Sequence, residues 1–210
     1  MRSIHRLAVF IITAFACVSA SATVVATNTS YGVIDGSQAT RALNVDVRGT
    51  ISDVNLTVEF SKCDNPPIGP TGRACTGSGS PFENEFTLVL VGPNGQQVTL
   101  VEPYSTYSVG LRGGAGRVSV TFDDEALRSL GPRVEAGSFR PDESLSLFDG
   151  MSLYGSWTLY LQDFFPADPL EFFSASLDIT YDPAPVPEPA TLAMLGLGLG
   201  LMGMRARRKR

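Results

Sequence analysis

The amino-acid sequence predicts an all-β protein folded as a two-sheet sandwich. Many short segments alternate apolar and polar residues with a period of two, which is typical of strands with one buried face. The 21 glycines and 14 prolines of the chain separate these segments as turns. With 43% hydrophobic and 18% charged residues, the 210-residue chain is too apolar for a disordered protein and suits one ordinary domain.

The strands are expected in a regular order along the chain. In the best defined one, Val54, Leu56, Val58 and Phe60 alternate with polar neighbours. Two further runs flank the turn Gly92-Pro93-Asn94-Gly95 and therefore predict a hairpin. Only residues 124–130 have a short helical pattern. The hairpin arms are centred on 86–90 and 98–100, and the other strands on 43–47, 118–122, 157–161 and 177–181.

The first 22 residues have the pattern of a secretory signal peptide. Arg2 and Arg6 form a positive start, an apolar run covers residues 7–18, and Ala20-Ser21-Ala22 supplies small residues for a signal peptidase. The alternative is a membrane anchor, but the run is shorter than the ~20 residues that a spanning helix needs. We therefore expect cleavage after Ala22 and export of the remainder.

The C-terminal end has three parts. Residues 183–189 form a linker that contains Pro187-Glu188-Pro189, residues 190–204 an apolar helix, and residues 205–210 a basic tail. At 1.5 Å per residue the helix is about 22 Å long, which is shorter than a ~30 Å hydrocarbon core. The basic tail would remain on the cytoplasmic side. The alternative is a plain anchor in which Gly196 and Gly200 pair helices.

This three-part end resembles the PEP-CTERM sorting signal of Gram-negative bacteria. Pro187-Glu188-Pro189, the glycine- and leucine-rich segment and the arginine cluster carry the resemblance. It implies a transient inner-membrane anchor, recognition by an exosortase-type enzyme, removal of the tail, and delivery to the outer cell surface or extracellular matrix. Such proteins are usually linked to exopolysaccharide and biofilm.

The part between the two ends is strongly acidic. Residues 23–187 contain nine basic and 20 acidic side chains, a formal charge of −11. This balance excludes a nucleic-acid binder, which needs a basic surface. Acidic surfaces favour solubility outside the cell and attract cations.

Two cysteines, Cys63 and Cys75, remain after removal of the signal peptide. Export places them in an oxidising compartment, and two cysteines permit a single pairing, so we expect a disulfide. A loop of this length gives about 3 kcal/mol of stabilisation in the chain-entropy description.

The exported part also resembles the P domain (P/Homo B domain) that follows the catalytic domain of subtilisin-like proprotein convertases. The resemblance implies a jelly-roll β-sandwich of the galactose-binding-like type over residues 23–182, with its core at about 43–182. The chain departs from the family at Ala175, where a tryptophan is usual, and at Ser61-Lys62, where a histidine often follows the strand. The matching blocks are 51–58, 86–100, 121–126, 145–150, 155–163 and 176–179.

The sequence predicts no enzyme. Its single histidine, His5, lies in the signal peptide, so the exported part holds no Ser-His-Asp, Cys-His or histidine-zinc arrangement. Paired carboxylates of a glycosidase are the remaining option. The candidates lie mostly in predicted turns, where acidic residues serve the backbone: Asp123, Asp124, Glu125, Asp142, Glu143, Asp163 and Asp168.

Calcium is the cofactor that the sequence allows. Hard oxygen ligands suit this ion, and five aspartates lie at predicted strand ends that converge if the loops meet: Asp53, Asp123, Asp124, Asp163 and Asp168. The alternative is that these are ordinary solvated loop carboxylates.

These observations lead to one functional hypothesis and two alternatives. The hypothesis is a non-catalytic structural or binding module of the cell surface or matrix, which contacts polysaccharide or a surface protein. The alternatives are an accessory module that supports a protease in trans, as P domains do in cis, and a secreted enzyme that acts on glycosides. Aromatic residues near predicted loops are the candidate contact surface: Tyr104, Tyr107, Tyr154, Phe164 and Phe165.

Overall fold

A computed structural model describes residues 21–184, Met194 and Arg205. The predicted signal peptide, except for its last two residues, and the motif Pro187-Glu188-Pro189 lie outside the described residues. So do the predicted apolar helix and basic tail, apart from Met194 and Arg205, which are both helical. No helix in the described part of the chain is long and apolar enough to cross a membrane.

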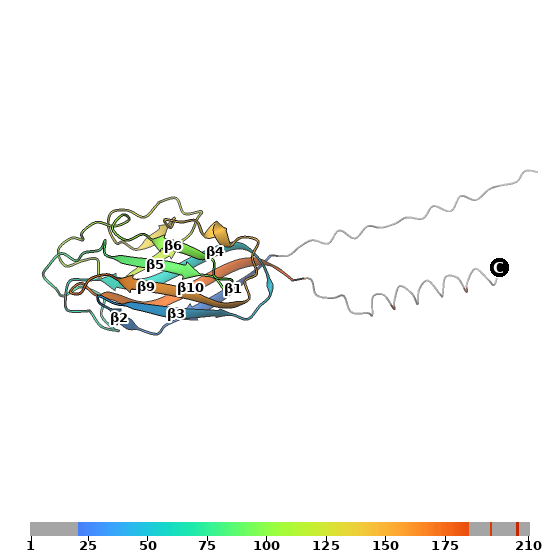
Figure 1. Cartoon of the computed structure of the whole chain (residues 1–210), viewed down its shortest axis with the longest axis horizontal. Helices are drawn as coiled ribbons and strands as arrows, with labels where there is room; N and C mark the ends of the chain where they lie inside the picture. The colour runs from blue at the N-terminus through green and yellow to red at the C-terminus, as the bar shows by residue number, and fades with distance from the viewer. Residues whose placement is uncertain (1–20, 185–193, 195–204, 206–210) are drawn as a thin grey trace, which may run out of the picture.

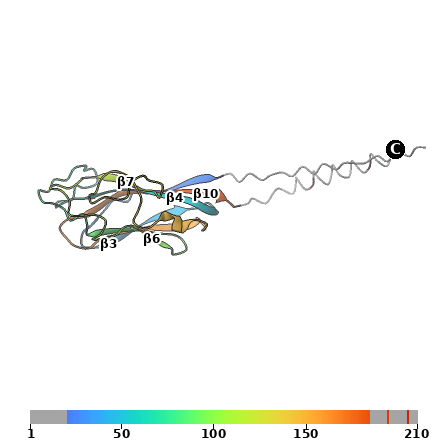
Figure 2. The ribbon, with the colours of Figure 1, turned by 90° about the horizontal axis from the view of Figure 1, so that it is seen from above.

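The chain forms two mainly antiparallel sheets packed face to face, which confirms the predicted sandwich (Figure 1). Figure 2 shows the layers edge-on, with β4, β7 and β10 in one and β3 and β6 in the other. One sheet has the order β1-β10-β4-β7-β8, with β2 also paired to β10, and contains β1 (Ala22–Asn28), β2 (Gly32–Ile34), β4 (Gly49–Lys62), β7 (Val118–Phe122), β8 (Gly137–Phe139) and β10 (Leu170–Pro183). The other has the order β3-β9-β5-β6 and contains β3 (Gln38–Val45), β5 (Phe86–Val91), β6 (Gln97–Val101) and β9 (Gly155–Asp163).

The strand order is that of a jelly roll. Without the short β2 and β8, eight main strands remain. Counted along the chain, one sheet has the order first, eighth, third, sixth, which is β1-β10-β4-β7. The other sheet has the order second, seventh, fourth, fifth, which is β3-β9-β5-β6. This arrangement places two Greek keys in one sandwich. The jelly-roll expectation from the P-domain resemblance is therefore confirmed as a fold.

The predicted strands are all present, and the structure adds others. β1, β2 and the short β8, which pairs in parallel with β7, were not expected from the sequence. The helix expected at residues 124–130 is wrong: this segment consists of turns and bends. The helical turn lies at Leu145–Phe148 instead, because Asp124 accepts hydrogen bonds from the backbone N–H groups of Leu145 and Ser146 at its start.

The core lies between the sheets and is built from the alternating apolar residues. Trp157 on β9 is fully buried, donates its indole N–H to the Leu153 carbonyl (3.0 Å) and meets the Phe148 ring edge-on at 4.8 Å. The hairpin turn closes with a bond from the Gly95 N–H to the Gly92 carbonyl, and Gly95 has a φ of 85° that favours glycine.

The sandwich has two distinct ends. At the terminal end, Ala22 at the start of β1 pairs with Tyr181 near the end of β10. At the loop end, Leu170 at the start of β10 pairs with Lys62 at the end of β4. Both β4 and β10 have 14 residues, so the ends lie roughly 40 Å apart at the usual rise per strand residue.

Candidate functional site at the loop end

A hollow of about 390 Å³ opens at the loop end. Three aromatic side chains border it, Phe82, Tyr104 and Phe165, and each is about half exposed. Polar groups of Asn84, Glu85 and Asp168 also line it. We call this hollow the loop pocket. Aromatic faces beside a few polar groups are the usual lining of ligand sites in proteins.

The backbone of three loops holds these side chains in place. Tyr104 has a φ of 63°, in a region that bulky residues rarely adopt, and its N–H donates to the Asn84 carbonyl at 2.7 Å. Ala167 has a φ of 103°, and its N–H donates to Asp35 Oδ1 at 2.9 Å. The Phe164 N–H donates to the Glu85 carbonyl at 3.0 Å, which joins two of the loops. Such conformations cost energy and concentrate at functional sites.

A buried charge cluster lies behind the loop pocket. The Lys62 side chain is fully buried, and its Nζ lies 2.9 Å from Glu85 Oε1 and 2.9 Å from Asp163 Oδ2. The same Nζ also donates to the Asp168 carbonyl oxygen. Burial raises the pKa values of the Glu85, Asp163 and Asp168 carboxyls, and the charge of Lys62 opposes each rise. One cation therefore lies between two buried carboxyls and a main-chain carbonyl oxygen in a space of low polarity.

A second buried carboxylate anchors the loop after β4. Glu171 is fully buried and accepts four hydrogen bonds, from the hydroxyls of Tyr31 and Ser61 and from the N–H groups of Ile68 and Gly69. These bonds satisfy the charge without a cation. The predicted disulfide in the same loop is confirmed, with the Cα atoms of Cys63 and Cys75 5.5 Å apart.

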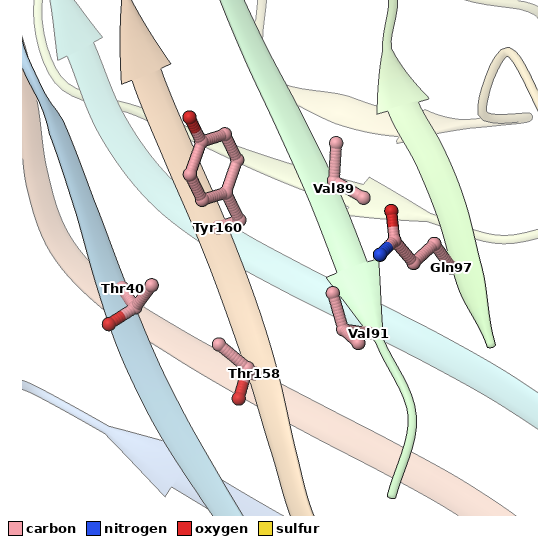
Figure 3. A pocket seen from close by; sticks show the side chains of 6 residues that line it. All are labelled: Thr40, Val89, Val91, Gln97, Thr158 and Tyr160. Carbon is pink, nitrogen blue, oxygen red and sulfur yellow. The ribbon is translucent and has the colours of Figure 1, made fainter. Parts of the chain in front are cut away.

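A shallow hollow of about 430 Å³ lies on the outer face of the four-stranded sheet (Figure 3). It is lined by neutral side chains: Thr40, Val89, Val91, Gln97, Thr158 and Tyr160. The Tyr160 hydroxyl lies 2.6 Å from Gln38 Oε1 and 2.7 Å from Gln162 Oε1, so neighbouring amides already engage it. This hollow offers one aromatic ring and no charged group, and the loop pocket is therefore the stronger candidate site.

The predicted aromatic surface is only partly assembled. Tyr104 and Phe165 border the loop pocket, and the Phe164 ring lies 5.7 Å from that of Tyr104. Tyr107 is wrong as a contact residue, because it is buried against the ring of Phe86. Tyr154 is exposed, but its ring contacts Arg48 near the terminal end.

Sequence reasoning missed two parts of the site. Phe82, the third aromatic of the loop pocket, lies between the predicted strands and is absent from the predicted aromatic surface. Lys62 was noted only as a departure from a family pattern, since nothing in its neighbours marks it as buried. Its partners Glu85 and Asp163 lie far along the chain, so no local pattern joins them.

The five predicted calcium ligands divide between the two ends. Asp163 and Asp168 belong to the Lys62 cluster at the loop end. Asp53, Asp123 and Asp124 lie at the terminal end, and burial together with these neighbouring charges raises the pKa of Asp53. Within residues 21–184, no three acidic, cysteine or histidine side chains are arranged to hold a metal ion. Calcium at the terminal end stays a prediction, which the unfolding midpoint with and without chelator tests.

The other glycosidase candidates serve the backbone. Asp142 accepts a hydrogen bond from the Glu102 N–H, and Glu143 accepts one from the Thr99 N–H, both at 2.6 Å. These two carboxylates therefore accept hydrogen bonds from backbone N–H groups of β6 and of the residue that follows it. At the terminal end, the exposed Glu125 has a raised pKa through its side-chain hydrogen bond to Asp123.

The fold and the loop pocket define a jelly-roll β-sandwich with a ligand-sized hollow at the end opposite Ala22 and Pro183. Residues 185–210 match the PEP-CTERM protein-sorting motif, so the chain carries the signal for exosortase-type sorting to the cell surface. No curated protein matches the sequence.

Several solved structures resemble the sandwich. The Aeromonas sobria serine protease in complex with a chaperone aligns with 79% of this chain at 14% identity and a TM-score of 0.46. The same protease without the chaperone aligns with 78% of this chain at 14% identity and a TM-score of 0.45. In both, the alignment covers 28% of the longer Aeromonas chain. The structure of FLHE aligns with 77% of this chain and 97% of its own at 10% identity and a TM-score of 0.39.

Proposed function

We propose that this protein is a non-catalytic binding module of the cell surface or matrix that holds a neutral polysaccharide in its loop pocket. The observation that carries the proposal is the convergence of Phe82, Tyr104 and Phe165 on one hollow. Aromatic faces pack against the apolar faces of sugar rings, and the carboxyl oxygens of Glu85 and Asp168 can accept hydrogen bonds from hydroxyl groups.

Charge narrows the ligand class. The exported part has a formal charge of −11, and two acidic residues line the loop pocket. Anionic polysaccharides would be repelled at this site, whereas neutral ones would not. The position of the loop pocket also supports the proposal, since a module held through its terminal end would present the loop end outward.

A role as an accessory domain for a separate protease is the second candidate. The jelly-roll strand order agrees with the P-domain resemblance that suggests it. This role predicts that the exported chain retains a protease in a pull-down from the cell surface and that polysaccharide does not compete for it. We favour the polysaccharide because it uses the aromatic border of the loop pocket.

Binding is tested by affinity electrophoresis of the full chain in gels that contain a neutral β-glucan, a neutral galactomannan or anionic alginate. We expect retardation in at least one neutral gel and none in alginate. Phe165→Ala should weaken the interaction about tenfold, the effect of losing about 1.4 kcal/mol of aromatic packing. Tyr154→Ala, which removes an exposed aromatic at the terminal end, is the matched control. Equal losses in the two variants, or no retardation by either neutral polymer, would contradict the proposal.

Sorting is tested by the intact mass of the protein recovered from the cell surface. A chain that ends before Thr191 is the expected result of tail removal. Retention of the arginine tail would instead indicate a permanent anchor.

A further inference from the structure

The Lys62 cluster has the composition and geometry of a reactive site. The amine of Lys62 and the carboxyl of Asp163 are both fully buried and lie 2.9 Å apart, and Glu85 lies 2.9 Å from the same nitrogen. We propose that Lys62 and Asp163 become joined by an intramolecular isopeptide bond, with Glu85 as the proton relay.

The two reacting groups come from opposite layers of the sandwich. Lys62 is the last residue of β4 in the six-stranded sheet, and Asp163 is the last residue of β9 in the four-stranded sheet. Lys62 pairs with the buried Leu170, and Asp163 pairs with the buried Phe86. Apolar neighbours exclude bulk water, which would otherwise favour the separated ions.

The surroundings of Asp163 favour the uncharged acid that condensation needs. Burial raises the pKa values of the Asp163 and Glu85 carboxyls. Moving the ammonium proton of Lys62 to Asp163 leaves a neutral amine beside a neutral carboxylic acid, and the total number of protons is unchanged. Burial lowers the cost of this transfer on the acid side, because the charged form of Asp163 loses its solvation by water.

The step balances without an oxidant or other reactant. The lone pair of Nζ attacks Cγ of Asp163 and forms the C–N bond. Glu85 takes a proton from the nitrogen and returns it to the departing hydroxyl oxygen, so the C–O bond breaks and one water leaves. Glu85 ends in its starting protonation state, which is the role of a general acid and base.

The loop pocket supplies a route for the departing water. Glu85 lines it while also contacting Nζ, and its side chain is 8% exposed. The product would tie β4 to β9 across the sandwich, next to the disulfide that begins at Cys63. This covalent tie would resist forces that pull the two sheets apart at the loop end.

Peptide mapping of the full chain, after denaturation and reduction, tests the bond. Trypsin does not cut after an acylated lysine, so the expected product is a branched species that contains both Lys62 and Asp163. The mass of this species should equal the summed masses of the two peptides it joins, minus the mass of one water molecule. Cleavage after Lys62, or a bridge from Lys62 to Glu85 or Asp168, would overturn the assignment.

Three variants distinguish an isopeptide bond from a strong ion pair. Lys62→Arg keeps a cation but lacks the nucleophilic amine and should yield no branched species. Asp163→Asn should form the same bridged product by releasing ammonia, which no ion pair can do. Glu85→Gln should slow bridging at least tenfold, and unchanged bridging would remove Glu85 from the mechanism. If a variant fails to fold, the map of the unaltered chain still decides the proposal.

Discussion

The two ends of the sandwich differ in the burial and the charge partners of their acidic side chains. At the loop end, Glu85 and Asp163 are buried, and Lys62 lies between them at 2.9 Å from each. At the terminal end, Asp53, Asp123 and neighbouring carboxyls remain partly or fully exposed and repel one another. Water screens the second group, but the first group needs a cation inside the protein. The difference shows that burial, more than the number of carboxyls, decides where this chain requires a partner inside the protein: a cation for Glu85 and Asp163, and four hydrogen-bond donors for Glu171.

The largest effect is expected from removing the buried cation. Lys62→Met leaves the carboxyls of Glu85 and Asp163 buried without their partner and should lower the free energy of unfolding by about 3–5 kcal/mol. The control is Arg48→Met, an exposed cation at the terminal end that contacts the ring of Tyr154, for which we expect less than about 1 kcal/mol. Urea unfolding monitored by Trp157 fluorescence measures both. Equal losses would mean that the two ends do not differ as described.

The next largest effect is expected from the disulfide. The double variant Cys63→Ser/Cys75→Ser should lose about 3 kcal/mol, because the unfolded chain regains the entropy of the open loop. Treating the unaltered protein with reductant should reproduce the lower thermal midpoint. Hydrogen exchange should increase mainly around Glu171 and the loop it anchors, and not around the Ala22–Tyr181 pair. Uniform acceleration over both ends would contradict a local role.

A smaller effect of opposite sign is expected at Tyr104. Asparagine tolerates a positive φ better than tyrosine, so Tyr104→Asn should raise the free energy of unfolding by about 0.5–1 kcal/mol. The same change removes an aromatic ring from the loop pocket and should weaken polysaccharide binding. Tyr154→Asn, at an exposed tyrosine of the terminal end, should bring no gain in stability. A loss of stability at Tyr104 would show that its ring packing outweighs the backbone strain.

The strands could be predicted from the sequence because each carries its own alternation. Val118, Val120 and Phe122 define β7 at its observed bounds, and the turn after Val91 defines the hairpin. β1 is not predicted from the sequence, because it is an edge strand in which only Ala26 is buried and its alternation is weak. The site was harder to predict, because Lys62, Glu85 and Asp163 meet only through the folding of both sheets.

The smallest effect is expected at Asp53, and its sign depends on pH. Burial and the charges of Asp123 and Asp124 raise the pKa of Asp53 in the folded protein. The folded state therefore holds this proton more tightly than the unfolded state, and stability falls as pH rises through the raised pKa. Asp53→Asn should add less than about 1 kcal/mol at pH 7, and the gain should vanish below about pH 4, where the native carboxyl is also neutral.

Asp46→Asn, at an exposed carboxyl outside this group, is the matched control and should change little at either pH. Asp163→Ala should have the opposite sign at pH 7, because it removes a partner of the buried Lys62. Urea unfolding at both pH values compares the three variants. Stabilisation by Asp163→Ala, or none by Asp53→Asn, would mean that carboxylate repulsion does not distinguish the terminal end from the loop end.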